Sequence, residues 1–229
     1  MSLIDLERLR MLSEARKDLK YLLDRGYNRS SALKLIGDRR QLSRSERSIL
    51  YRSVYSRADA EAIASKRVKA GELIDAEVWA DGFNILNTVE AMLRGDPIIL
   101  SDDGVLRDFS EIHGKYRLTQ NTHNALNLIV EGLKELRVAQ AWIIFESQIS
   151  RSGEIAAYTR KLLDKAGLRG GSMAMKAVDS ELIRSGEVVL SSDSAILLRC
   201  KKFFDISAYM IRKLSSVKII SLASKGEII

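Results

Sequence analysis

The sequence has little cysteine and histidine, and each shortage excludes a class of protein. A single cysteine, Cys200, among 229 residues excludes an internal disulfide framework and any zinc site built from several cysteines. Two histidines leave little material for a histidine-rich metal centre. No apolar run approaches the roughly 20 residues that span a bilayer, and the opening MSLIDLERLR lacks the apolar core of a signal peptide. We therefore expect a cytoplasmic protein without a membrane segment.

What the sequence does contain is a patterned chain with an uneven charge. Hydrophobic residues make up 46% and charged residues 29%, which suffices for one large core and a smaller appendage. The net charge is +7, but residues 1–70 hold 17 Lys and Arg against 9 Asp and Glu, whereas residues 71–229 hold 20 against 21. This asymmetry indicates a basic surface that attracts polyanions beside a near-neutral body. A solvated helical surface without a ligand is the alternative.

Residues 1–70 show helical patterns throughout. Leucines recur at three- and four-residue spacing in the first helix, which Gly26 should end. Ser30 is the predicted cap of a second, short helix ending at Gly37, and the run SRSE (43–46) has the spacing of a capping box before a third. The sequence thus predicts a small basic helical domain over residues 1–70.

From about residue 72 the pattern changes to short apolar runs that alternate with helical ones. This alternation is typical of a parallel sheet wrapped by helices, so we expect a three-layer α/β/α domain over residues 72–229. The candidate strands are AEVWA (76–80), PIIL (97–100), AWIIF (141–145), MKAV (175–178), EVVL (187–190), VKIISL (217–222) and a shorter one near KFFDI.

A carboxylate follows each of five successive candidate strands. The acids are Asp81, Asp102 with Asp103, Glu146, Asp179 and Asp193. Ligands of open α/β sheets bind at the carboxyl ends of the strands, so these side chains are expected to converge. Clustered carboxylates need a compensating cation, and Mg²⁺ or Mn²⁺ accepts oxygen ligands. The alternative for each acid alone is a helix cap or a turn.

Polar residues beside two of these acids strengthen the case for a site. The runs DGFN and SSDS hold more polar groups than a helix cap requires. Gly82 permits a sharp turn or a close approach. Asn84, Ser191 and Ser192 are expected to orient carboxylates or waters around the ion.

Four of these runs also resemble a known superfamily. VWADGFNIL, WIIFES, KAVDSELI and VVLSSDSAIL, within residues 76–215, are similar to the motif series of the PIN and NYN metal-dependent ribonucleases. More closely, the whole chain resembles an archaeal family that joins a small basic helical domain, with the signature LLDRGYNRSSALKLIGDRR, to a PIN-like domain.

The resemblance implies a role for individual acids. It implies that Asp81, Glu146, Asp179 and Asp193 are catalytic and bind the metal. Glu146 departs from the usual aspartate of the NYN pattern by one methylene. Asp102 lies outside that pattern, and its inclusion among the metal ligands rests on the strand-end argument alone.

The function expected from these observations is a metal-dependent ribonuclease that uses Mg²⁺ or Mn²⁺. The basic helical domain would present RNA by contacts with its phosphates, and ISRSGE (149–154) would add one more. The candidate contacts are Arg25, Arg29, Arg39, Arg40, Arg44, Arg47 and Arg151. Four tyrosines are candidates for stacking on bases, although their helical spacing favours a core position for at least half of them: Tyr21, Tyr27, Tyr51 and Tyr55.

Two other classes of function remain open. One is a non-catalytic nucleic-acid-binding or ribonucleoprotein-assembly module that keeps the fold. The other is an enzyme acting on a small phosphate ester or nucleotide in the same metal crevice. A bound metal ion would distinguish a ribonuclease from the non-catalytic module. The size of the substrate would distinguish a ribonuclease from the enzyme acting on a small phosphate ester or nucleotide.

Overall fold

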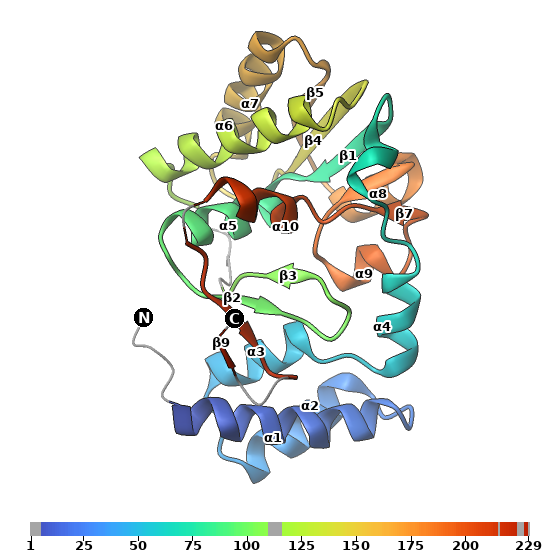
Figure 1. Cartoon of the computed structure of the whole chain (residues 1–229), viewed down its shortest axis with the longest axis vertical. Helices are drawn as coiled ribbons and strands as arrows, with labels where there is room; N and C mark the ends of the chain where they lie inside the picture. The colour runs from blue at the N-terminus through green and yellow to red at the C-terminus, as the bar shows by residue number, and fades with distance from the viewer. Residues whose placement is uncertain (1–5, 110–115, 215, 224–226, 229) are drawn as a thin grey trace. The chain divides into compact units, whose positions relative to one another are not determined.

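The chain folds into two compact units (Figure 1). The computed structural model describes residues 6–109, 116–214, 216–223 and 227–228. The first unit comprises Met1–Ser65, Gly95–Phe109 and Val217–Ile229, and the second comprises Lys66–Arg94 and Ser110–Ser216. In the described part of the chain, no helix has both the length and the apolar character needed to cross a bilayer.

The helices of the first unit follow the leucine and capping patterns closely. They are α1 (Leu6–Leu23), α2 (Arg29–Arg39), α3 (Arg44–Ser53) and α4 (Arg57–Ala64). Gly26, with φ of +78°, lies in the left-handed conformation after α1, as expected of a residue that ends a helix. The capping box is confirmed, because Ser43 Oγ accepts from the Glu46 N–H and the Glu46 carboxylate accepts from the Ser43 N–H.

Helix α2 departs from the sequence prediction at both ends. Its N-cap is Asn28 rather than Ser30, and the Asn28 side chain accepts from the Ser31 N–H at 3.1 Å. The helix also continues past Gly37. The missing side chain there leaves room for a guanidinium, since a Cβ on Gly37 would lie 2.3 Å from Arg47 Nη1.

Four short strands complete the first unit, in the order β3-β2-β8-β9. They are β2 (Ile98–Leu100), β3 (Leu106–Arg107), β8 (Ile219–Ser221) and β9 (Glu227–Ile228). The sequence assigned PIIL and VKIISL to the sheet of residues 72–229, and this assignment is wrong. Both runs are strands, but they pair with each other, and Ile99 and Ile220 pack in one core with Leu12 and Ile49 of the helices.

The charge asymmetry of the sequence is smaller between the folded units. The first unit holds 17 Lys and Arg against 14 Asp and Glu, and the second holds 20 against 16. One reason is that Lys66, Arg67 and Lys69 belong to the second unit, and the other is that Gly95–Phe109 brings four aspartates to the helices. Two of them pair with helical arginines, Asp102 with Arg16 at 2.6 Å and Asp108 with Arg52 at 3.6 Å.

The second unit contains a five-stranded sheet whose neighbouring strands are all parallel, so the chain is an α/β protein with a preceding helical region. The strand order is β5-β4-β1-β6-β7. The strands are β1 (Glu77–Asp81), β4 (Gln140–Glu146), β5 (Arg169–Met175), β6 (Val188–Leu190) and β7 (Lys202–Phe203). The helices are η1 (Ala70–Leu73), α5 (Gly82–Leu93), α6 (Gln120–Glu135), α7 (Ser152–Ala166), α8 (Val178–Ser185), α9 (Ser194–Leu197), α10 (Ile206–Met210) and η2 (Ile211–Lys213).

One strand of this sheet was misplaced by the sequence. MKAV (175–178) is not a strand: β5 ends at Met175, and α8 begins at Val178. The true strand, RGGSMAM, lacks β-branched residues, so its composition does not indicate a strand. Gly170 has φ of +114°, and a Cβ there would lie 2.0 Å from the Ala141 carbonyl oxygen, so the pairing with β4 requires glycine.

The chain reverses direction once within this sheet. After β1 it proceeds outward to β4 and β5, then returns through α8 to β6 on the other side of β1 (Figure 1). Right-handed crossovers therefore place α8 on the face opposite to α5, α6 and α7. Because the connections from β1 and β6 leave in opposite directions, the carboxyl ends of these two strands form the switch point where open α/β sheets bind ligands.

Candidate metal centre

Asp81 stands at the switch point, at the end of β1. Its partly buried carboxylate caps α5 by accepting from the Asn84 N–H at 3.3 Å, and it also accepts from Ser191 Oγ at 3.4 Å. The next residue, Gly82, packs directly on β4, since a Cβ there would lie 2.6 Å from the Phe145 ring. The sequence Asp-Gly thus brings the carboxylate and the start of α5 against the middle of the sheet.

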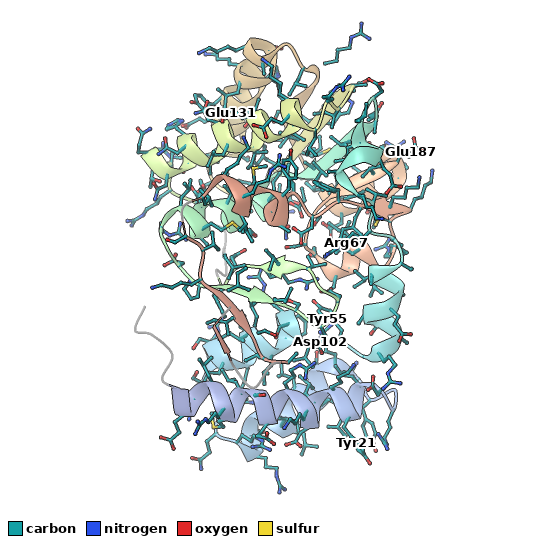
Figure 2. The ribbon with its side chains drawn as sticks, viewed as in Figure 1. Tyr21, Tyr55, Arg67, Asp102, Glu131 and Glu187 are labelled. Carbon is teal, nitrogen blue, oxygen red and sulfur yellow. The ribbon has the colours of Figure 1, made fainter. Side chains whose placement is uncertain are left out.

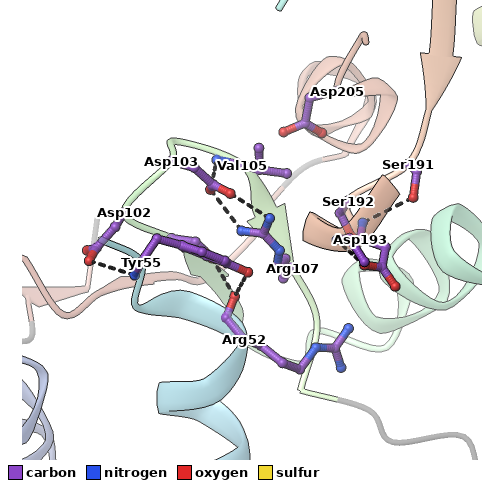
Figure 3. Close-up of polar contacts among 12 residues, drawn as sticks. Arg52, Tyr55, Asp102, Asp103, Val105, Arg107, Ser191, Ser192, Asp193 and Asp205 are labelled. Carbon is purple, nitrogen blue, oxygen red and sulfur yellow. Dashed lines mark hydrogen bonds and ion pairs between the residues drawn. The ribbon is translucent and has the colours of Figure 1, made fainter. Parts of the chain in front are cut away.

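The segment after β6 is tied to the start of α5. Asn84 Oδ1 accepts from both the N–H and the Oγ of Ser192, at 2.7 and 2.9 Å. Ser191 Oγ accepts from the Asp193 N–H at 3.0 Å (Figure 3). Asp193 in turn caps α9 by accepting from the Ala195 N–H at 2.7 Å. These bonds hold two strand-end acids, Asp81 and Asp193, at the same edge of the sheet.

The acids of this edge interact electrostatically. Burial, together with the negative charges of Asp193 and Asp179, raises the pKa of Asp81 to about 7, against the opposing hydrogen bonds from Asn84 and Ser191. Asp179 lies in the first turn of α8, and burial followed by the charges of Asp193 and Glu146 raises its pKa as well. Electrostatic interactions thus link Asp81, Glu146, Asp179 and Asp193, and we call these four residues the acidic cluster.

Asp102 belongs to the other compact unit. It lies in the turn between β2 and β3 of the first unit, because its strand belongs to the second sheet. Its carboxylate accepts from Arg16 Nε at 2.7 Å and from the Tyr55 N–H at 3.2 Å (Figure 3). The charge of Asp102 is therefore balanced by Arg16, and its assignment as a metal ligand stays a prediction.

Asp103 has an equally structural environment that the sequence did not reveal. It forms a two-pronged ion pair with Arg107, at 2.8 and 2.6 Å, and both side chains are almost fully buried (Figure 3). The Arg107 guanidinium also lies 4.9 Å from the centre of the Tyr55 ring. The sequence separation of four residues between Asp103 and Arg107 was the signal from which an ion pair could have been predicted. Nothing in that spacing indicated that the pair would be buried.

The donor chemistry of the acidic cluster suits a hard divalent cation. Its four acids offer only carboxylate oxygens, which Mg²⁺ and Mn²⁺ prefer. Raised pKa values show that the negative charge is not fully compensated by the protein. Among the residues that the structure describes, however, no three His, Cys, Asp or Glu side chains are grouped closely enough to hold an ion. The four acids thus do not form a closed coordination shell in the described part of the chain.

The predicted phosphate contacts differ in their surroundings. Arg40 pairs with Asp18 at 2.6 Å, and Arg47 pairs with Asp38 at 2.9 Å. Arg29 donates to the Val54 carbonyl oxygen, and Arg151 pairs with Glu154 at 3.3 Å. The remaining candidates are exposed side chains of the first unit: Arg25, Arg39 and Arg44.

The tyrosines of the helical region are mostly exposed. Of the four candidates for base stacking, only Tyr55 is buried, so the expectation that at least half belong to the core is wrong. Tyr21, Tyr27 and Tyr51 are each about half exposed or more, and Figure 2 shows Tyr21 and Tyr55. The first unit therefore presents aromatic rings as well as cations to solvent.

Fold and site together define an α/β protein with acidic residues at the switch point of a parallel sheet. The chain belongs to the family described as domain of unknown function DUF5616, whose model matches residues 70–209, and a second model, protein of unknown function DUF434, matches residues 11–66. The uncharacterized protein MJ0935 of Methanocaldococcus jannaschii is 32% identical over 186 residues, which cover 81% of this chain and 88% of the relative. No solved structure matches the chain. The expected archaeal relative is thus found, whereas kinship with PIN and NYN ribonucleases stays a prediction.

Proposed function

We propose that this protein is a PIN/NYN-like ribonuclease that hydrolyses RNA phosphodiesters with Mg²⁺ or Mn²⁺ at the acidic cluster. The observation that supports the proposal is that the charges of Asp179 and Asp193 act on Asp81, which lies at the switch point of the sheet. Helix capping accounts for Asp81 and Asp193, but Asp179 caps no helix, so capping does not explain all three acids.

Asp81, Asp179 and Asp193 would hold the ion, and Glu146 would contribute directly or through water. A divalent ion bound there supplies the charge that lowers the pKa of a bound water and stabilises the developing charge on the phosphate. Its presence would also relieve the repulsion that raises the pKa of Asp81 and Asp179.

The supporting residues have separate tasks in this proposal. Asn84 holds the segment after β6 through its two bonds to Ser192, which keeps Asp193 in place relative to Asp81. Ser191 donates to Asp81 and thereby fixes the orientation of that carboxylate. Arg199, whose charge lowers the pKa of Asp179, is exposed and is suited to meet a substrate phosphate.

The helical region would supply binding rather than chemistry. Its exposed arginines, Arg25, Arg39 and Arg44, would contact phosphates without reading sequence. The two units have similar net charges, +3 for the first and +4 for the second. RNA would therefore be held by individual arginines rather than attracted by an excess of positive charge on the first unit.

The test is cleavage of single-stranded RNA with and without Mn²⁺ by the parent protein and by Asp193→Asn. Asparagine preserves the cap of α9 but removes a charge from the cluster, so cleavage should fall by at least about 100-fold. Asp164→Asn is the matched control, because Asp164 is exposed on α7 of the same unit, and its cleavage rate should stay unchanged. The proposal fails if the parent shows no metal-dependent cleavage across varied RNAs.

A non-catalytic RNA-binding module is the second candidate. This candidate is favoured because, among the described residues, no three acidic side chains are grouped closely enough to hold a metal ion. For such a module, RNA binding would be measurable, but Mn²⁺ would change neither the RNA nor the melting temperature of the protein.

A further inference from the structure

A hollow of about 860 Å³ opens in the first unit, between the end of α1, the start of α2 and the start of α4. This volume falls within the range of pockets that bind small molecules. All of its lining residues lie between Leu23 and Glu61, so the hollow belongs to one unit and is independent of the acidic cluster.

Tyr27 offers this hollow an aromatic face. Tyr27 is 59% exposed, the highest value among the tyrosines of the described residues. The Arg25 guanidinium already lies 3.4 Å from the centre of the Tyr21 ring, and the Arg29 guanidinium lies 4.9 Å from that of Tyr51. Within the described residues, no arginine or lysine lies over the Tyr27 ring, which is therefore open to stacking.

The charged groups around the hollow are of both signs. Arg57 supplies an exposed cation, whereas the Arg29 guanidinium is held by the Val54 carbonyl oxygen and lies 4.3 Å from the centre of the buried Tyr55 ring. An exposed guanidinium at the rim of a hollow is suited to meet a phosphate oxygen. Three carboxylates also line the hollow, and they can only accept hydrogen bonds: Asp24, Asp59 and Glu61.

We infer that this hollow binds one nucleotide of a single-stranded RNA. The base stacks on Tyr27, and the exocyclic amino group of adenine, cytosine or guanine donates to the carboxylates, while Arg57 meets a flanking phosphate. Uracil lacks an amino group and should bind less well. The inference rests on the proposed function in one respect, namely that the ligand is RNA. It requires neither a bound metal ion nor cleavage of the RNA.

The experiment measures binding of fluorescently labelled rC12 and rU12, and of unlabelled cytidine 5′-monophosphate by competition, in EDTA at fixed low salt. Tyr27→Ala should weaken the binding of rC12 about tenfold, the scale of losing one stacked base. Tyr21→Ala is the matched control, an exposed tyrosine of the same unit outside the hollow, and it should change the affinity less than about twofold. Thermal melting checks that both variants remain folded.

The parent protein should prefer rC12 to rU12, and Tyr27→Ala should reduce this preference. If Tyr27→Ala binds rC12 as the parent does, or if Tyr21→Ala loses as much, the hollow is not the site, although RNA binding elsewhere stands. If cytidine 5′-monophosphate binds as tightly as rC12, the ligand is a free nucleotide and the RNA assignment is wrong. If the parent binds no rC12, the inference fails, while the Mn²⁺-dependent cleavage assay still judges the acidic cluster.

Discussion

The Asp81 carboxylate lies among other acids, and its proton is therefore coupled to the stability of the fold. Its pKa is about 7 in the folded chain, against about 3.9 for an unfolded aspartate. The folded state thus binds the proton more tightly. This contribution to stability is full below about pH 4 and is lost as the pH rises through about 7.

Asp81→Asn should remove this pH dependence. In metal-free solution, the parent should lose stability between pH 5 and pH 8 relative to Asp81→Asn, by an amount on the order of 2 kcal/mol after allowance for solvent around a partly exposed carboxylate. Urea unfolding at several pH values measures the difference. Asp164→Asn should keep the parent's slope. Parallel pH profiles for the parent and Asp81→Asn would contradict the coupling.

Single residues of the site were predictable where the chemistry was local. Asp81, Asn84 and Ser191 stood out because polar groups gathered directly after apolar runs, and the structure places them in contact. The role of Asp102 was not readable in this way. Its partner Arg16 lies 86 positions away, and local sequence does not show which distant residue will neutralise a charge.

Among the elements, the junction of β1 and α5 depends on a glycine at position 82. The start of α5 approaches β4 so closely that a Cβ on Gly82 would lie 2.6 Å from the Phe145 ring. We expect Gly82→Ala to destabilise the protein by about 2 kcal/mol or more, because the ring must move within a packed core. Chemical denaturation measures this loss.

Gly153→Ala is the control for that substitution. Gly153 lies in the first turn of α7, and nothing lies within 4 Å of a Cβ built there. Alanine should leave stability unchanged or raise it by up to about 1 kcal/mol. Equal effects of the two substitutions would show that the close packing of α5 on β4 is not what Gly82 serves.

The elements themselves were predicted best where the pattern was strong. The apolar runs of β1, β4 and β6 were recognised because their residues are β-branched or aromatic. β5 was displaced because glycine and serine fill it, and its pairing depends on backbone approach to β4 rather than on side chains. Local sequence indicates a buried strand by its β-branched and aromatic residues. A strand built from small residues, which allow close backbone approach, therefore gives no such signal.

At the scale of the whole molecule, the compact units do not follow the order of the chain. The sequence divided it near residue 71, but Gly95–Phe109 and Val217–Ile229 belong with the helices. Strand pairing is a long-range property, and β2 pairs with β8 from more than a hundred residues further along the chain. Apolar pattern alone could not show that these runs form a second sheet.

This arrangement predicts the behaviour of a fragment that begins at residue 72. Without the helices, Ile99 and Ile220 lose the apolar side chains that cover them, and Asp102 loses Arg16. Backbone amides of β2 and β8 should therefore exchange hydrogen rapidly in the fragment, whereas those of β1 and β4 should stay protected. Equal protection of β2 and β8 in the fragment and the full chain would support the division near residue 71 instead.

The most direct test of the acidic cluster is calorimetric titration of Mn²⁺ into the full-length protein, Asp193→Asn and Asp164→Asn at neutral pH. If the cluster holds a divalent ion, the parent and Asp164→Asn should bind Mn²⁺ saturably with the same affinity, and Asp193→Asn should bind at least about tenfold more weakly. Binding should also release protons, because the raised pKa of Asp81 leaves it partly protonated near pH 7. Absence of saturable binding to the parent, or equal affinity of all three proteins, would contradict the account.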